Sequence, residues 1–121
     1  MSVTTEKFIT AEATDIDDRI TILLRAMSAA NEMHLALAYP GFKPYEFGYD
    51  KGKKYSRIWV NNGTQTFVCF FVQRDNGDVW KAGGWKAPVL NFTRGNIMTT
   101  EGITEITLGR ISPQGYWYHG M

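Results

Sequence analysis

The sequence is poor in the residues that mark a known chemistry. It has one cysteine and two histidines, and 13 Lys and Arg stand against 12 Asp and Glu. A single thiol, Cys69, excludes an internal disulfide, and its apolar neighbours predict a buried, inert side chain rather than a nucleophile. The net charge of +1 gives no global reason to expect nucleic acid or a membrane surface as a partner.

Long apolar runs and targeting segments are also absent. No stretch approaches the roughly 18 apolar residues of a membrane helix, and MSVTTEKFITAEATD has neither the basic start nor the apolar core of a signal peptide. We therefore expect no membrane association and a location in a reducing cytoplasm. A chain of 121 residues, 44% of them hydrophobic, is predicted to form one α+β domain over residues 1–121.

Metal and catalytic signatures are missing as well. The histidines, His34 and His119, belong to no HxxxH pattern, and neither CxxC, DxDxDG nor GxSxG occurs. The glycine-rich run KAGGWK at 81–86 opens no helix, so it is a weak phosphate-loop signal. The acidic cluster DIDD at 15–18 is explained by helix capping. We expect a non-enzymatic protein with no metal and no cofactor.

One long helix is predicted for about residues 15–38. Thr14 and Asp17 approximate a capping box, and the apolar residues from Ile16 to Ala38 follow a helical stripe. Pro40 and Gly41 end the helix. At 1.5 Å per residue, a helix of about 24 residues is roughly 36 Å long. One of its faces must therefore pack on other elements.

The rest of the chain predicts an antiparallel sheet. Residues 40–54 are interpreted as a connection and 89–102 as irregular, while the dipeptide Asn76-Gly77 predicts a two-residue hairpin turn with φ > 0 at both positions. The predicted strands are 55–60, 65–73, 78–82, 103–110 and 116–119. The expected fold is α+β, with one long N-terminal helix packed on an antiparallel β-sheet of three to five strands.

The strand around residues 65–73 is apolar on both faces, which is typical of a central strand. In the preceding strand Tyr55, Arg57 and Trp59 share one face, and Trp80 and Lys81 point to opposite faces of the following strand. Two interpretations stay open. Either the C-terminal aromatic residues Tyr116, Trp117 and Tyr118 or the aromatic loop at 40–54 cover the second face, or that face is an exposed aromatic binding surface.

Lysines and aromatic residues alternate in two regions, and single-strand nucleic-acid binders combine such groups in one groove. The cations would hold phosphates, and Trp80, Trp85 or Tyr45 would stack on bases. The candidate binding residues are Trp80, Lys81, Trp85, Lys86, Arg94, Lys53, Lys54, Arg57 and Tyr45.

The segment GDVWKAGGWKAP at 77–88, preceded by an aliphatic-aromatic strand, resembles a family of small uncharacterised proteins encoded by tailed bacteriophages. The resemblance covers about residues 53–95, a third of the chain. It implies a phage origin and an accessory role, and it names no ligand. The chain departs from the family pattern at 64–66, where that pattern has Ser or His, and at 89–90, where it has a basic residue.

Two functions follow as hypotheses. The first is a small phage accessory protein that acts by protein binding or assembly with a host protein, a phage protein or itself, in the infected cell's cytoplasm or in the virion. The second is single-stranded nucleic-acid binding. Near-neutral charge favours the first, and the alternation of lysines with aromatic residues favours the second. Clustering of Lys53, Lys54, Arg57, Lys81 and Lys86 beside an exposed ring would favour nucleic acid.

Overall fold

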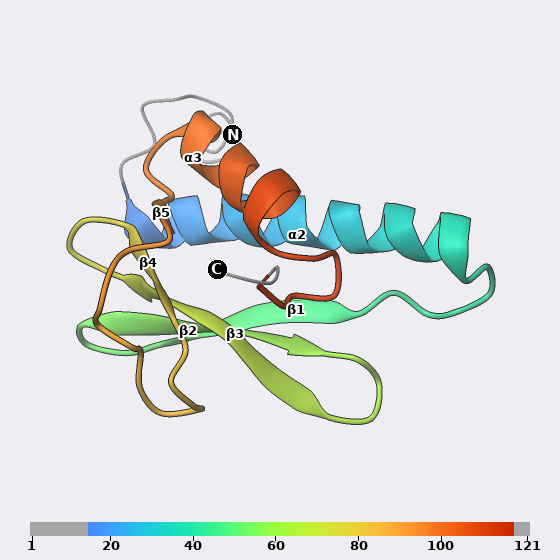
Figure 1. Ribbon diagram of the computed structural model, residues 1–121, viewed down its shortest axis with the longest axis horizontal. Coiled ribbons are helices and arrows are strands. Elements are labelled where there is room, and N and C mark those ends of the chain that lie inside the picture. The colour runs from blue at the N-terminus through green and yellow to red at the C-terminus, as the bar shows by residue number, and fades with distance from the viewer. Residues whose placement is uncertain (1–14, 118–121) are drawn as a thin grey trace, which may run out of the picture.

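The computed structural model describes residues 15–117 and consists of a helical layer on one face of an antiparallel sheet (Figure 1). The sheet has five strands in the order β1-β2-β3-β4-β5. The elements are α2 (Ile16–Ala38), β1 (Glu46–Lys51), β2 (Tyr55–Asn61), β3 (Thr66–Gln73), β4 (Asp78–Lys81), β5 (Gly95–Asn96), α3 (Thr100–Glu105) and the π-helix η1 (Ile106–Arg110). The α+β fold with one long N-terminal helix is confirmed.

Helix α2 forms where the apolar stripe predicts it. Its N-cap is Asp15, whose side chain accepts the N–H of Asp17 at 2.8 Å. Thr14, the expected cap, lies outside the described residues. The buried positions of the helix recur every three or four residues and include Ile20, Leu23, Met27, Asn31 and Leu35.

The core lies between this helical layer and the inner face of the sheet. The fully or almost fully buried side chains of the sheet include Ile58, Val60, Phe70, Val72 and Val79. Those of the helical layer and its connections include Ile20, Leu23, Ile97, Ile103 and Ile106. Trp117 also packs on this core, with its ring centroid 5.5 Å from that of Phe70. The C-terminal tail therefore covers the helix side of the sheet.

The prediction that residues 40–54 are only a connection was wrong for the second half of that segment. Residues 46–51 form β1, which pairs along its whole length with β2. Glycines at 48 and 52 lower the intrinsic strand propensity of this segment, so propensity alone does not predict the strand. Pairing with β2 and burial of Phe47 and Tyr49 against the core outweigh that propensity.

The predicted strand over 103–110 was also wrong, because these residues form α3 and η1. The buried residues Ile103, Ile106 and Thr107 follow the i, i+3, i+4 spacing of a helix, whereas a strand would put Ile103 and Ile106 on opposite faces. Thr99 caps α3 by accepting the N–H of Gly102 at 3.0 Å. A Cβ at Gly102 would overlap the Asn96 carbonyl, so glycine allows the helix to contact β5.

Two smaller expectations also changed. The β3–β4 hairpin lies where predicted, but its turn has four residues, 74–77, and only Gly77 has positive φ (82°). At the C-terminus, Trp117 forms a single bridge with Ile111 rather than a strand. Residues 118 and 119 of that expected strand lie outside the described range.

Candidate functional site

The outer face of the sheet, away from the helices, is partly covered by the loop that follows β4. Arg57, on the outer face of β2, donates from Nη1 to the carbonyl of Trp85 at 3.0 Å, and its guanidinium lies 4.3 Å from the centroid of the Trp85 ring. The loop therefore crosses the outer side of β3, where Phe71 is only 3% exposed. The sequence analysis did not single out this loop as the cover of the second face, and Trp85 itself stays 43% exposed.

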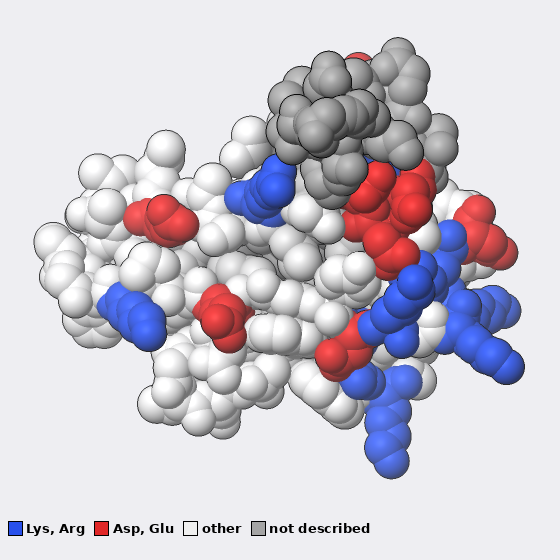
Figure 2. Space-filling view, turned by 180° about the vertical axis from the view of Figure 1, so that it is seen from behind, with Lys and Arg blue, Asp and Glu red and all other residues white. Residues whose placement is uncertain are grey.

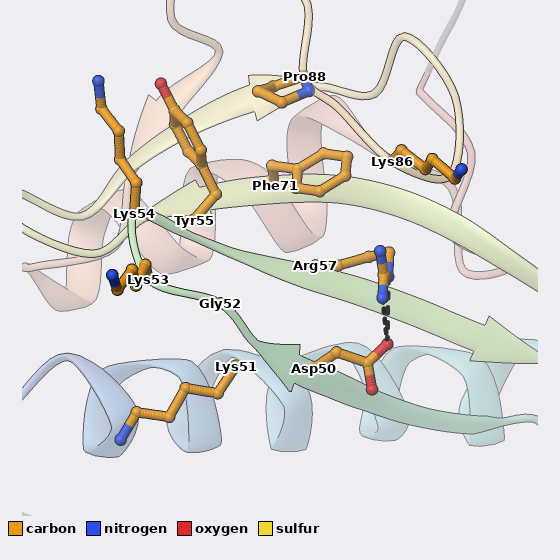
Figure 3. Close-up of a pocket in the computed structure, with 10 residues that line it drawn as sticks. All are labelled: Asp50, Lys51, Gly52, Lys53, Lys54, Tyr55, Arg57, Phe71, Lys86 and Pro88. Carbon is orange, nitrogen blue, oxygen red and sulfur yellow. Dashed lines mark hydrogen bonds and ion pairs between the residues drawn. The ribbon is translucent and has the colours of Figure 1, made fainter.

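A pocket of about 280 Å³ opens between this loop and the β1–β2 turn, and it is called the basic pocket below (Figure 3). Five cationic side chains line it, together with Asp50, Gly52, Tyr55, Phe71 and Pro88. The five are Lys51, Lys53, Lys54, Arg57 and Lys86. Lys53 and Lys54 lie at one end, Lys86 lies at the other, and aromatic side chains lie between them (Figure 3).

The charge of the basic pocket is only partly compensated. Arg57 pairs with Asp50 at 3.0 Å, and Lys51 pairs with Asp17 at 3.2 Å. Lys53, Lys54 and Lys86 form no ion pair with any described residue. Figure 2 shows Lys and Arg side chains gathered at the end of the molecule that holds the β1–β2 turn. A molecule of near-zero net charge thus carries a local cationic surface.

Asp17 anchors this end of the molecule to helix α2. Its carboxylate accepts hydrogen bonds from Arg74 at 2.8 and 3.0 Å and from Tyr49 at 2.8 Å. It also forms an ion pair with Lys51. The hydrogen bonds from Arg74, followed by those from Tyr49 and Lys51, hold the pKa of Asp17 well below its usual range. Burial, with the hydrogen bond to Asp17, raises the pKa of Tyr49 to about 12. The network fixes β1 against the helix beside the pocket.

The structure places the other predicted binding residues away from the basic pocket. Trp80 is on the outer face but donates its indole N–H to Gln73 at 3.0 Å. Lys81 points to the opposite face and lines a separate pocket with Trp117. Tyr45 packs against the core on the helix side. Arg94 is 4% exposed and bonds to Asn91 and to the Phe92 carbonyl.

The sequence analysis missed six lining residues: Asp50, Lys51, Gly52, Tyr55, Phe71 and Pro88. The first two belong to β1, which was taken for a loop. The alternation of Phe47 and Tyr49 with Gly48 and Asp50 is the signal that would have identified that strand and its outward side chains.

Residues 4–118 match a family described as a family of unknown function, DUF7717. The chain belongs to the DUF7717 family. The expectation of an uncharacterised family is thereby confirmed, whereas the tailed-phage origin and the hairpin motif stay predictions. No curated protein and no solved structure matches the chain.

A second surface of this DUF7717 chain is apolar. A groove of about 550 Å³ lies between α2 and η1, on the side of the helical layer away from the sheet. Met33, Leu37 and Leu108 line it and are 66%, 81% and 73% exposed. His34 is at its edge, where its Nε2 lies 2.8 Å from Nε2 of Gln114. The lining contains no carboxylate and no lysine or arginine.

The remaining chemistry-bearing groups form no further site in the described range. Burial raises the pKa of the Cys69 thiol to about 12, so the thiol stays protonated at neutral pH. Residues 15–117 contain no cluster of histidine, cysteine and carboxylate side chains suited to hold a metal ion. Within the same range, no helix combines the length and the apolar character needed to span a membrane.

Proposed function

We propose that this protein binds single-stranded nucleic acid through the basic pocket. One observation carries the proposal: Lys53, Lys54, Arg57 and Lys86, which span 34 positions of the sequence, surround one pocket beside aromatic rings. The uncompensated lysines would release counterions from phosphates. The exposed Trp85 ring, stacked on Arg57, would bind bases by stacking and cation–π contact.

The dimensions of the basic pocket favour a segment of a polymer over a whole cofactor. Small-molecule sites usually measure about 300–1,000 Å³ and enclose most of the ligand, and this pocket lies at the lower limit of that range. A volume of about 280 Å³ suits a phosphate with its sugar or base. Duplex readers usually insert a helix or a β-ribbon into the major groove, whereas these lysines surround a concavity. The geometry therefore favours a single strand.

The test is fluorescence anisotropy with labelled single-stranded DNA, RNA and duplex at about 50 and 200 mM salt. We expect binding that weakens steeply with salt. The variant Lys54→Ala, Lys86→Ala should lower the slope of log K against log salt by about 1.4, because each single-strand phosphate contact contributes about 0.7. Lys43→Ala, an exposed lysine outside the pocket, is the control and should keep the slope. Absence of binding at 50 mM salt would overturn the proposal.

A second candidate function is protein binding, and the apolar groove between α2 and η1 favours it. The occupant we propose is a second copy of the chain. Small residues (Ala26, Ala29 and Ala30) precede large ones (Met33 and Leu37) on the same face of α2. An antiparallel pairing of two α2 helices would set large side chains against small ones, as an isologous two-fold interface requires.

Sedimentation velocity tests this assembly. We expect a concentration-dependent dimer that Leu37→Glu converts to a monomer, because a buried carboxylate without a partner is costly. Glu32→Gln, an exposed position on the same helix, is the matched control. A monomer at all concentrations up to about 100 µM would reject self-association, since even a weak dimer with Kd near 1 µM forms there.

We also propose the phage accessory role that the segment 77–88 implies, with action in the cytoplasm of the infected cell or in the virion. The resemblance of that segment supports this origin. Mass spectrometry of purified virions and of infected cells separates the two locations. Detection in virions at stoichiometric amounts would favour a structural component over an intracellular nucleic-acid binder.

A further inference from the structure

A second concavity adjoins the basic pocket on the outer face of the sheet, and it is called the tryptophan pocket below. It measures about 370 Å³ and is lined by Glu46, Asp50, Trp59, Asn61, Thr66 and Trp85. Asp50 lines both pockets, and Arg57 links that carboxylate to Trp85. A chain whose phosphates lie in the basic pocket would therefore reach this second pocket with the adjoining base.

Two indoles form the aromatic part of the tryptophan pocket. The ring of Trp59 lies over Gly48 of the neighbouring strand, where a Cβ would overlap it, so glycine at this position leaves room for the ring. One face of Trp85 is covered by the Arg57 guanidinium at 4.3 Å, yet the residue stays 43% exposed. The uncovered part of that indole can stack on a base.

Two carboxylates supply open hydrogen-bond acceptors to the tryptophan pocket. Within the described residues the Glu46 carboxylate has no partner, and both bonds from Arg57 to Asp50 go to Oδ2, which leaves Oδ1 open. The Asn61 side chain is engaged within the protein, because its amide nitrogen donates a hydrogen bond to Thr66 Oγ1 and its amide oxygen accepts one from the N–H of Gly63. Ionised carboxylates only accept.

We propose that the tryptophan pocket binds one nucleobase and selects cytosine and adenine, whose exocyclic amino group stands where thymine, uracil and guanine carry a carbonyl oxygen, an inference that rests on the proposed binding of single strands. Cytosine and adenine offer an amino donor to Glu46 or Asp50, as carboxylates accept from the cytosine amino group elsewhere. Thymine and uracil direct carbonyl oxygens at the same place, where two carboxylates repel them. The Thr66 hydroxyl keeps its own hydrogen for a ring nitrogen or carbonyl of the bound base.

The experiment compares labelled dC12 and dT12, with dA12 as a third probe, by anisotropy at one salt concentration. The probes carry equal charge, so the phosphate contribution cancels. We expect dC12 to bind about tenfold more tightly than dT12. Glu46→Gln should reduce this ratio toward one and leave the salt slope of dC12 unchanged. Glu32→Gln, on helix α2, should keep the ratio.

The outcomes separate the two proposals. If dC12 and dT12 bind with equal affinity, or dT12 binds more tightly, base selection is wrong while single-strand binding stands. If the ratio survives Glu46→Gln and Asp50→Asn together, the carboxylates do not select the base, and the assignment of this pocket is rejected. If no oligonucleotide binds, the proposed function and this inference both fail.

Discussion

At the scale of single residues, Asp17 connects three parts of the structure that lie far apart in the sequence. It lies in the first turn of α2 and bonds to β1 through Tyr49 and to the β3–β4 turn through Arg74. Its sequence neighbours suggested only a capping role, because acidic residues are common in a first helical turn. The tertiary structure instead assigns the cap to Asp15.

We predict that Asp17→Asn lowers the free energy of unfolding at pH 7 by about 1–3 kcal/mol, since hydrogen bonds to a charged group are lost. The folded pKa of Asp17 lies below its unfolded value of about 3.9. Its contribution is therefore fully present above that value and is lost as the pH falls toward the lowered folded pKa.

Urea unfolding at pH 7, 5 and 3 measures this effect. The difference between the wild type and Asp17→Asn should shrink at pH 3. Asp75→Asn, an exposed position in the β3–β4 turn, should change stability by less than about 0.5 kcal/mol. A difference that stays constant down to pH 3 would show that the charge of Asp17 does not stabilise the fold.

At the scale of elements, one buried polar side chain of α2 forms hydrogen bonds with two other parts of the chain. Asn31 is fully buried, accepts the N–H of Tyr45 at 2.8 Å and donates to the carbonyl of Pro113 at 3.0 Å. It therefore fixes the connection into β1 and the C-terminal turn on the same helix. The sequence alone gave no partner for this side chain.

We predict that Asn31→Leu lowers the free energy of unfolding by about 2–4 kcal/mol. The leucine fits the apolar surroundings, yet a buried N–H and a buried carbonyl lose their partner at about 1–3 kcal/mol each. Chemical denaturation measures the loss, and Glu32→Ala, exposed on the next helical position, is the control. A stability equal to that of the wild type would mean that both groups find other partners.

At the scale of the whole molecule, the two candidate surfaces lie on opposite layers. The apolar groove lies on the helical layer, and the basic and tryptophan pockets open on the outer face of the sheet. The core between the layers holds both in place, and no residue lines both the groove and either pocket. Sites that share no residues usually behave additively.

We therefore predict that changes on the two surfaces act independently. Leu37→Glu should abolish the proposed dimer and leave the affinity for dC12 within about twofold. Lys54→Ala with Lys86→Ala should weaken oligonucleotide binding and leave the sedimentation profile unchanged. Anisotropy and sedimentation velocity on both variants test this. Loss of both properties in either variant would show that assembly and binding are coupled, for example through a bound strand that spans two copies.

The sequence by itself determined the elements whose signals are local. The 3.6-residue stripe and the Pro40-Gly41 stop predicted α2, and β-branched and aromatic residues predicted β2, β3 and β4. It also determined which residues of β2 share a face, since alternation follows from backbone geometry. The candidate cations Lys53, Lys54, Arg57 and Lys86 came from the same local pattern of lysine beside aromatic residues.

Only the tertiary structure decided the rest. Residues 103–110 are rich in the β-branched residues typical of a strand, and packing against α2 selects the helix. β1 pairs with the edge of β2, and the alternation within residues 47–50 does not tell which strand it pairs with. The return of the 82–94 loop across β3 brings Lys86 into the pocket that the lysines of the β1–β2 turn also line, while burial removes Arg94 from the surface. These contacts join residues distant in sequence, and local propensity carries no information about such pairs.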